Sequence, residues 1–224
     1  PDTQPPIIAQ FDPLQNSPIK YNLEKIKVNI YVDENSWLIK EESLDLTRSI
    51  GGCKYSTIET DNFDSMTNIM SCVKNKIKDI DRYLCTTELQ LKPNQDNKFY
   101  FACKDVAKNT YPGNQPYTLR STQQPLKISQ SGPNGNVFTP DVTLTATTEG
   151  GSDNGKAKCY YSSQNAFSSQ GLIFRKTDLN QHSTILPSLR QGEYKYYIWC
   201  RDAAGNEDNK EINFKATTPD LFIR

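Results

Sequence analysis

The stretch Glu193-Tyr-Lys-Tyr-Tyr-Ile-Trp-Cys-Arg-Asp-Ala-Ala-Gly-Asn206 decides the fold of this chain. Its first part is aromatic and β-branched, and the side chains from Tyr194 to Arg201 alternate between two faces. Its second part, residues 202–206, holds the small residues, glycine and asparagine of a tight turn. The stretch therefore predicts a β-strand that runs directly into a tight turn.

The same strand and turn occur earlier in the chain, which indicates an internal repeat. Lys98-Phe-Tyr-Phe-Ala-Cys-Lys-Asp-Val-Ala-Lys-Asn109 has the same order of aromatic, cysteine, basic and acidic residues. Upstream of each copy lies a second matching pair, Cys53-Lys-Tyr-Ser56 and Cys159-Tyr-Tyr-Ser162. Because order and spacing both agree, the sequence predicts two homologous β domains in tandem, each with one equivalent disulfide.

These motifs carry a resemblance to a known family. Leu189-Arg-Gln-Gly-Glu-Tyr194, followed by an alternating strand, resembles the tyrosine corner and sixth strand of a fibronectin type III domain. With the two Cys-x-Tyr-Ser segments, Phe63-Asp-Ser-Met66 and the opening Asp2-Thr-Gln-Pro-Pro-Ile7, the chain resembles tandem Ig-like/fibronectin type III-like repeats of bacterial and archaeal secreted or cell-surface proteins. The resemblance implies a structural corner at Leu189 and Tyr194, whereas the first repeat has Asn97 at the corner position.

The repeat and the resemblance together predict an all-β fold of two Ig-like/fibronectin type III-like β-sandwiches. We expect the first in residues 1–121, with inserts at 35–50 and 71–85, and the second in residues 122–224. The segment between them holds one proline and predicts limited hinge freedom.

The second insert predicts a short helix. Its apolar residues Val73, Ile77 and Leu84 recur, together with Ile80, at intervals of three to four, with Lys and Asp between them. Cys72 and Cys85 bracket the segment, so we expect a helix held onto the sandwich by a local disulfide. A recognition insert peculiar to the first domain is the alternative interpretation.

The six cysteines predict three disulfides and an oxidising environment. Six cysteines allow about 15 pairings, and the repeat selects among them: Cys53–Cys103, Cys159–Cys200 and, from what remains, Cys72–Cys85. We therefore expect an extracellular or cell-surface location.

Composition excludes several classes of function. The chain has 26 Lys and Arg residues and 26 Asp and Glu residues, so its formal net charge is zero. This balance of charge argues against non-specific electrostatic binding to nucleic acid or anionic lipid. No apolar run approaches the length of a membrane span. The opening Pro-Asp-Thr-Gln-Pro-Pro lacks a signal-peptide pattern, so we expect a mature or excised piece.

We find no catalytic constellation in the sequence, and no cofactor is expected. The single histidine, His182, lies in a predicted strand, and bridging of all thiols leaves no nucleophilic cysteine. A lone histidine also argues against a Cys/His zinc site. Asp202, Asn206 and Asp208, with Glu207, form a weak calcium candidate whose spacing matches no known calcium loop, so solvated turn residues are the favoured interpretation.

Three aromatic residues, Tyr160, Tyr197 and Trp199, are expected to face outward on neighbouring strands. An exposed aromatic patch can stack on sugar rings or on a partner protein. Cross-strand stacking that only stabilises the sheet is the alternative.

The two ends of the chain hold apolar segments that could add a strand to a neighbouring copy. Residues of this kind are Ile7, Ile8 and Phe11 at one end and Leu221, Phe222 and Ile223 at the other. The alternatives are a first strand within its own domain and a linker, respectively. The sequence thus predicts a non-enzymatic structural module of a cell-surface filament, stalk or surface layer that associates with itself or with neighbouring repeats. An adhesive or carbohydrate-binding module, with a glycan or cell-surface protein as partner, is the alternative.

Overall fold

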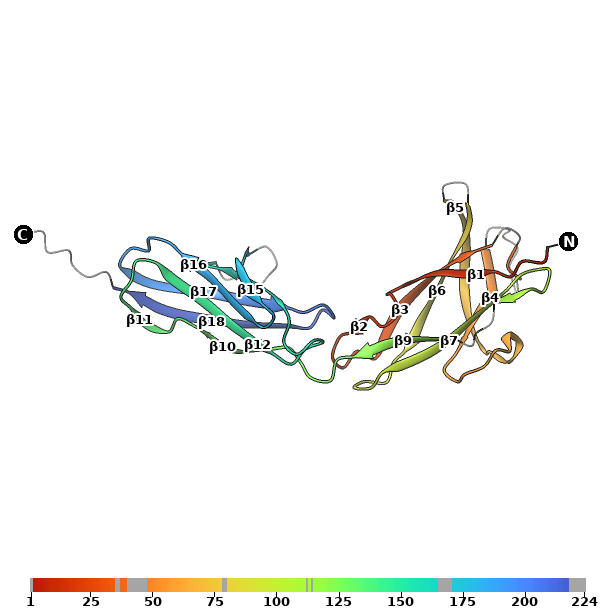
Figure 1. Ribbon diagram of the computed structural model, residues 1–224, viewed down its shortest axis with the longest axis horizontal. Helices are drawn as coiled ribbons and strands as arrows, with labels where there is room; N and C mark the ends of the chain where they lie inside the picture. The colour runs from red at the N-terminus through yellow and green to blue at the C-terminus, as the bar shows by residue number, and fades with distance from the viewer. Residues whose placement is uncertain are drawn as a thin grey trace, which may run out of the picture. The chain divides into compact units, whose positions relative to one another are not determined.

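The computed structural model describes residues 2–34, 37–39, 48–77, 80–111, 113, 115–164 and 171–217, except for the side chains of 48–50, 75–77 and 80–81. The fold of these residues is all-β, with 18 strands and one short 3-10 helix (Figure 1). The chain divides into two compact units: unit 1 is Pro1–Ser17 with Leu23–Arg120, and unit 2 is Pro18–Asn22 with Ser121–Arg224. The expected boundary after residue 121 therefore lies one residue further along than the division, and the segment Pro18–Asn22 belongs to unit 2.

The strands that precede residue 122 form one nine-stranded sheet of order β1-β3-β6-β5-β4-β7-β9-β2, in which β8 also pairs with β7. Their bounds are β1 (Ile7–Asp12), β2 (Pro18–Ile19), β3 (Lys25–Asp33), β4 (Arg48–Ser56), β5 (Asn68–Ile77), β6 (Ile80–Gln90), β7 (Asn97–Lys104), β8 (Thr110–Tyr111) and β9 (Pro116–Ser121). The 3-10 helix η1 (Phe63–Ser65) lies between β4 and β5.

Strand β4 has an irregular pairing with its neighbour. It pairs with β5 up to Ile50 and from Lys54 onward, with a register shift between them, and with β7 from Cys53 to Ser56. Gly51 lies in the shift with a φ of 84°, a backbone conformation that glycine adopts at little cost. Buried side chains of the sheet, among them Phe101 and Tyr117, form the core of unit 1.

Aromatic side chains close that core between the first and last strands of unit 1. The Phe11 ring of β1 stacks on Tyr117 of β9 with centroids 4.5 Å apart, and it contacts Phe101 of β7 edge-on at 5.5 Å. Tyr117 also donates its hydroxyl to the Pro13 carbonyl at 2.8 Å. Burial raises the Tyr117 pKa, with the Asp12 charge as a smaller cause.

The predicted helix over residues 71–85 is wrong, because this segment is the β5–β6 hairpin. Val73 is paired directly with Leu84, and Ile77 with Ile80. The spacing of three to four residues therefore arises from two nested cross-strand pairs of adjacent antiparallel strands, and it imitates one face of a helix. Cys72 is paired with Cys85 in the same register, so the two cysteines staple the hairpin.

Unit 2 contains two sheets that face each other. One has the order β10-β12-β16-β15, and the other has the order β11-β18-β17-β13-β14. The strand bounds are β10 (Lys127–Gly132), β11 (Gly135–Val137), β12 (Val142–Glu149), β13 (Lys158–Ser162), β14 (Leu172–Ile173), β15 (Lys176–Asp178), β16 (Gln181–Leu186), β17 (Gly192–Arg201) and β18 (Glu207–Ala216). Inward residues of both sheets, such as Leu144 and Ile198, form one buried core, as alternation along the strands requires.

The two units repeat the same local irregularity in their first strands. The pair Ile8–Val32 joins β1 to β3, and the pair Ile128–Thr148 joins β10 to β12; a register shift follows each pair immediately. The two shifts match β1 with β10 and β3 with β12, with Ile8 at the position of Ile128 and Val32 at the position of Thr148. Other positions in the two units are matched from there through their strand pairings.

The N-terminal segment proposed as a strand donor is an internal strand. Ile7, Ile8 and Phe11 belong to β1, which pairs antiparallel with β3 of the same unit. The alternative interpretation of a first strand within its own domain therefore agrees with the pairing. Residues Leu221, Phe222 and Ile223 lie outside the described residues.

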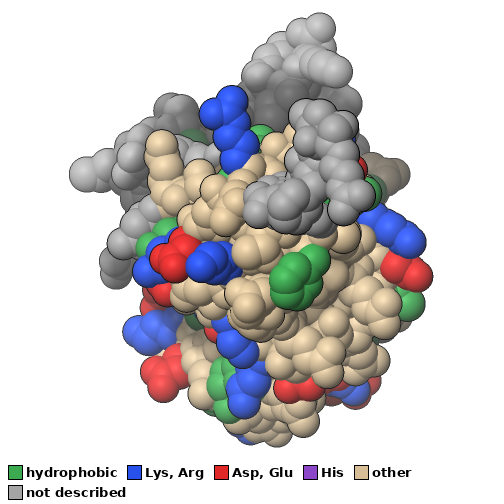
Figure 2. All heavy atoms as spheres, turned by 90° about the vertical axis from the view of Figure 1, so that its left-hand side faces the viewer, with side chains coloured by type: hydrophobic (Ala, Val, Ile, Leu, Met, Phe, Trp, Pro, Cys, Tyr) green, Lys and Arg blue, Asp and Glu red, His purple; other side chains and the backbone are tan. Residues whose placement is uncertain are grey.

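The surface carries both signs of charge. On the face drawn in Figure 2, Lys and Arg side chains are interspersed with Asp and Glu, and hydrophobic side chains stand apart from one another. Within the part of the chain that the structure describes, no helix combines the length and the hydrophobicity that a membrane span requires.

Candidate functional site

Each unit contains the same closed turn after its organising strand. In unit 2, the Asp202 carboxylate accepts the backbone N–H of Asn206 and the side-chain amide of Asn206, both at 2.8 Å. In unit 1, Asp105 accepts the same two groups of Asn109, again at 2.8 Å. The aspartate–asparagine clasp was not predicted from the matched turns. Its signal in the sequence is an Asp followed four residues later by an Asn in both turns.

The residues of the weak calcium candidate, Asp202, Asn206 and Asp208, make hydrogen bonds within the protein. The Asp202 carboxylate also accepts N–H groups of Ser152 and Ala204. Asp208 lies on β18, where its carboxylate accepts the Ile128 N–H at 2.6 Å. The oxygens of these two aspartates therefore hold protein N–H groups and organise loops. Asn206 in turn accepts the Tyr21 N–H at 2.7 Å within unit 2.

The three disulfides have the pairings that the repeat predicts: Cys53–Cys103, Cys72–Cys85 and Cys159–Cys200. Each joins directly paired residues of neighbouring antiparallel strands. In unit 1 the two bridges touch, because Cys53 Sγ and Cys85 Sγ are 3.6 Å apart. No cysteine of the chain has a free thiol.

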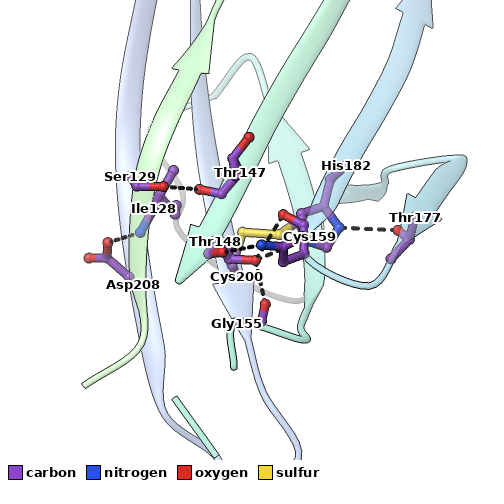
Figure 3. The surroundings of a disulfide bond; sticks show 11 residues. Ile128, Ser129, Thr147, Thr148, Gly155, Cys159, Thr177, His182, Cys200 and Asp208 are labelled. Carbon is purple, nitrogen blue, oxygen red and sulfur yellow. Dashed lines mark hydrogen bonds between the residues drawn. A yellow bond between two sulfur atoms is a disulfide. The ribbon is translucent and has the colours of Figure 1, made fainter. Parts of the chain in front are cut away.

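His182 lies beside the disulfide of unit 2 (Figure 3). It is 2% exposed, and its ring nitrogens lie 3.1 Å from the Thr148 hydroxyl and 3.2 Å from the Thr177 hydroxyl. Thr148 also donates its hydroxyl to the Gly155 carbonyl. Burial lowers the pKa of His182. The ring is thus a hydrogen-bonded part of the core, inaccessible as a general base.

The corner of unit 2 has the hydrogen bond that the resemblance implies. Tyr194 donates its hydroxyl to the Arg190 carbonyl at 3.0 Å. The Tyr194 ring stacks on Phe214 with centroids 5.5 Å apart. Leu189 packs against the core of the same unit.

In unit 1 the corner position is occupied by Asn97, which makes three hydrogen bonds. Its amide donates to the carbonyls of Lys92 and Gln95 at 3.0 and 2.8 Å. Its carbonyl accepts the Lys92 N–H at 2.8 Å. A buried asparagine thus closes the corner by a different route.

The expected patch of exposed aromatic residues is wrong in part. Tyr197 and Trp199 are each only 8% exposed, although they lie on the outer face of β17. The Lys195 ammonium lies 5.5 Å from the centre of the Tyr197 ring, and Trp199 packs on Tyr160 of β13 with centroids 5.3 Å apart. Long neighbouring side chains therefore cover residues that strand alternation places outside.

Two of these aromatics line a groove of about 570 Å³ in unit 2, which we call the Tyr160–Trp199 groove. Its walls come from the loop before β13, from the β15–β16 turn and from the start of the turn after β17. The lining residues are Asp153, Lys156, Ala157, Lys158, Tyr160, Thr177, Leu179, Trp199, Arg201, Asp202 and Ala203. Tyr197 is not among them. Leu179 and the basic residues of this groove were missed by sequence analysis, because their proximity depends on the tertiary fold.

Comparison with known proteins identifies the fold. No protein-family model matches the sequence, and a search of curated proteins gives no match. The fibronectin(III)-like modules of Clostridium thermocellum CbhA match with a TM-score of 0.54 and 8% identity over 98% of this chain and 97% of that chain. At this identity the likeness shows the fold alone, which is fibronectin type III-like.

Two further solved structures match less well. A marsupial T cell receptor has a TM-score of 0.47 and 9% identity over 94% of this chain and 73% of that chain. The FN1–FN3 domains of chicken CNTN1 have a TM-score of 0.42 and 8% identity over 90% and 65% of the respective chains.

Proposed function

We propose that the chain is a non-enzymatic extracellular module of a bacterial or archaeal cell-surface assembly, built from two homologous tandem domains. The observation that carries this proposal is the disulfide arrangement: all six cysteines join directly opposed strands, and both units have the bridge between equivalent strands. Such bridges persist in oxidising surroundings, and disulfide-rich domains of this fold are typical of extracellular proteins.

The reactive side chains support a non-enzymatic role. His182 is buried between two threonine hydroxyls, and no thiol is free to act as a nucleophile. The Asp202 carboxylate is occupied by N–H groups of its own turn. These residue types are the usual acids, bases and nucleophiles, and in this chain they serve the fold.

Two measurements test this proposal. Intact source cells are labelled with a membrane-impermeant amine reagent, and the exposed lysines of the protein are expected to react; labelling only after lysis would contradict a surface location. Purified protein is then viewed by negative-stain electron microscopy. Filaments, rings or sheets would support a structural building block, whereas monomers at every concentration would argue against assembly.

A binding module is the second candidate function, and the Tyr160–Trp199 groove favours it. Pockets with an apolar wall and a few polar groups are the usual form of ligand sites. A glycan array probed with the purified chain tests this candidate. Saturable binding that is lost when Tyr160 is changed to serine in a folded protein would support it.

A further inference from the structure

Two cations lie side by side at one end of the Tyr160–Trp199 groove. Lys158 on β13 is paired directly with Arg201 on β17, so both side chains project from the same face of the sheet. Both residues are exposed. Like charges in directly opposite positions on neighbouring strands repel each other, so this pairing costs stability unless an anion lies between them.

Only one of the two cations has an anionic partner. Arg201 forms an ion pair with Glu207, in which Nε and Oε1 are 3.5 Å apart. Glu207 is the residue paired with Arg201 on β18. Among the described residues, no carboxylate pairs with Lys158. The two carboxylates that line the groove are already engaged: Asp153 pairs with Lys156, and Asp202 accepts N–H groups of its own turn. Lys158 is therefore the cation of the groove that is left for an acidic ligand, beside the Arg201–Glu207 pair.

Aromatic residues occupy the next row of the same face. Tyr160 is paired with Trp199 across β13 and β17, and their ring planes meet at 45°. Leu179 of the β15–β16 turn, which is 66% exposed, adds an apolar surface to the groove. Trp199 is buried beneath Tyr160, which is only partly buried, so Tyr160 supplies the aromatic face of the floor. Aromatic faces of this kind accept the C–H faces of sugar rings.

The floor of the groove does not suit an extended peptide. Strand β13 lies between β14 and β17, and β17 lies between β13 and β18. The backbone of β13 is paired on both sides at Tyr160 and Tyr161, and β17 is paired with both β13 and β18, whereas strand addition requires an unpaired sheet edge. Recognition in this groove must therefore rely on side chains.

We propose that the Tyr160–Trp199 groove binds an acidic oligosaccharide, with a uronate carboxylate between Lys158 and Arg201. The sugar ring that carries this carboxylate lies against Tyr160, which packs on Trp199. This inference rests on the binding function proposed above and names its ligand class. Because this contact joins a carboxylate to exposed cations, affinity decreases as salt is added.

Fluorescence of Trp199 provides a direct test. The chain has 2 tryptophans, so the full-length W37F variant leaves Trp199 as the sole tryptophan, which is excited at a wavelength that tyrosine does not absorb. Oligogalacturonate is titrated against it, and a fully methyl-esterified oligogalacturonate of the same length serves as the neutral control. We expect a saturable change with the acidic sugar and at least tenfold weaker binding of the ester. Equal affinity for both would overturn the carboxylate contact.

Matched charge reversals locate the contact. K158E is expected to weaken binding of oligogalacturonate at least tenfold. K127E makes the same charge change on an exposed lysine of the opposite sheet, and it should alter affinity less than twofold. An equal loss in both variants, or no loss in either, would overturn the site. Poly-glutamate of similar charge that bound as tightly as the sugar would overturn the ligand class.

The outcomes separate this inference from the function on which it rests. Neutral oligosaccharides that perturbed Trp199 as strongly as acidic ones would overturn the acidic specificity and leave a binding module in place. No response of Trp199 to any glycan would overturn the inference and the binding candidate together. Surface labelling of cells does not involve the groove and tests the extracellular location independently.

Discussion

The two units place different chemistry at the same position beside a shared disulfide. In unit 1, Cys85 pairs across the sheet with Ile30 and is bonded to Cys72. At the matching position of unit 2, His182 pairs with Ala146 and hydrogen-bonds to Thr177 at 3.2 Å. A covalent cross-strand link in one unit thus corresponds to a hydrogen bond in the other. Matching strand positions thus accept either a disulfide or a hydrogen bond. Because unit 2 has one disulfide and unit 1 has two, we expect the stability of unit 2 to depend more on its single disulfide.

Removal of that bridge is expected to have the largest effect. C159A/C200A should lower the free energy of unfolding of unit 2 by about 4 kcal/mol, because the bridge closes a loop with a sequence separation of 41. C72A/C85A, with a separation of 13, should cost unit 1 about 3 kcal/mol. Urea titration of W37F and W199F backgrounds reports each unit separately. A smaller loss in unit 2 than in unit 1 would contradict the comparison.

The corners offer the next comparison. N97A removes three hydrogen bonds from a buried position of unit 1 and should cost about 2 kcal/mol. Y194F removes one hydrogen bond from unit 2 and should cost about 1 kcal/mol. The same urea titrations measure both variants. A neutral Y194F would show that the corner hydrogen bond does not contribute to stability, and equal losses would show that the two corners are equivalent.

Acidification should weaken unit 2 selectively. Burial lowers the pKa of His182 in the folded state, whereas the unfolded chain titrates near pH 6.5. Below that pH the unfolded state takes up a proton that the folded state does not, so stability decreases as the pH decreases. The slope is at most about 1.4 kcal/mol per pH unit.

Melting of each unit between pH 7.5 and 5.5 measures this effect. The chain has 1 histidine, so unit 1 provides an internal control without such a group. H182Q should abolish the selective slope in unit 2. A decrease that persists in H182Q would assign the pH dependence to other groups.

The smallest expected effect is a gain in stability. Thr184 of β16 is 3% exposed, and its hydroxyl lacks a hydrogen-bond partner among the described residues. T184V should stabilise unit 2 by up to about 1 kcal/mol, because it removes a buried unsatisfied group without changing shape. The matched control is T87V, since Thr87 pairs with Val28 as Thr184 pairs with Leu144 but is only partly buried. A loss in T184V would indicate a hydroxyl contact outside the described residues.

The core and the disulfides follow closely from sequence pattern, whereas the candidate site does not. The strand predicted around Ile198 is β17, and its turn lies where the glycine and asparagine indicate. Of the three predicted outward aromatics, only Tyr160 and Trp199 line the groove. Lys158 was not predicted as a site residue, because nothing in its local sequence distinguishes it from other exposed lysines. It becomes a candidate binding residue only through its pairing with Arg201 on another strand.

Local pattern by itself predicted the alternating strands and the cysteine pairing, because each depends on neighbours in sequence or on a comparison of two similar segments. Only the tertiary structure decided that residues 71–77 and 80–85 form paired antiparallel strands, since nested cross-strand pairs and a helical stripe share one spacing. It alone decided that Trp199 is covered, because the covering Tyr160 belongs to a different strand. It also assigned Pro18–Asn22 to unit 2, where the Tyr21 N–H binds an asparagine that follows it by 185 residues. Such contacts have no local signature, since chain folding alone brings these residues together.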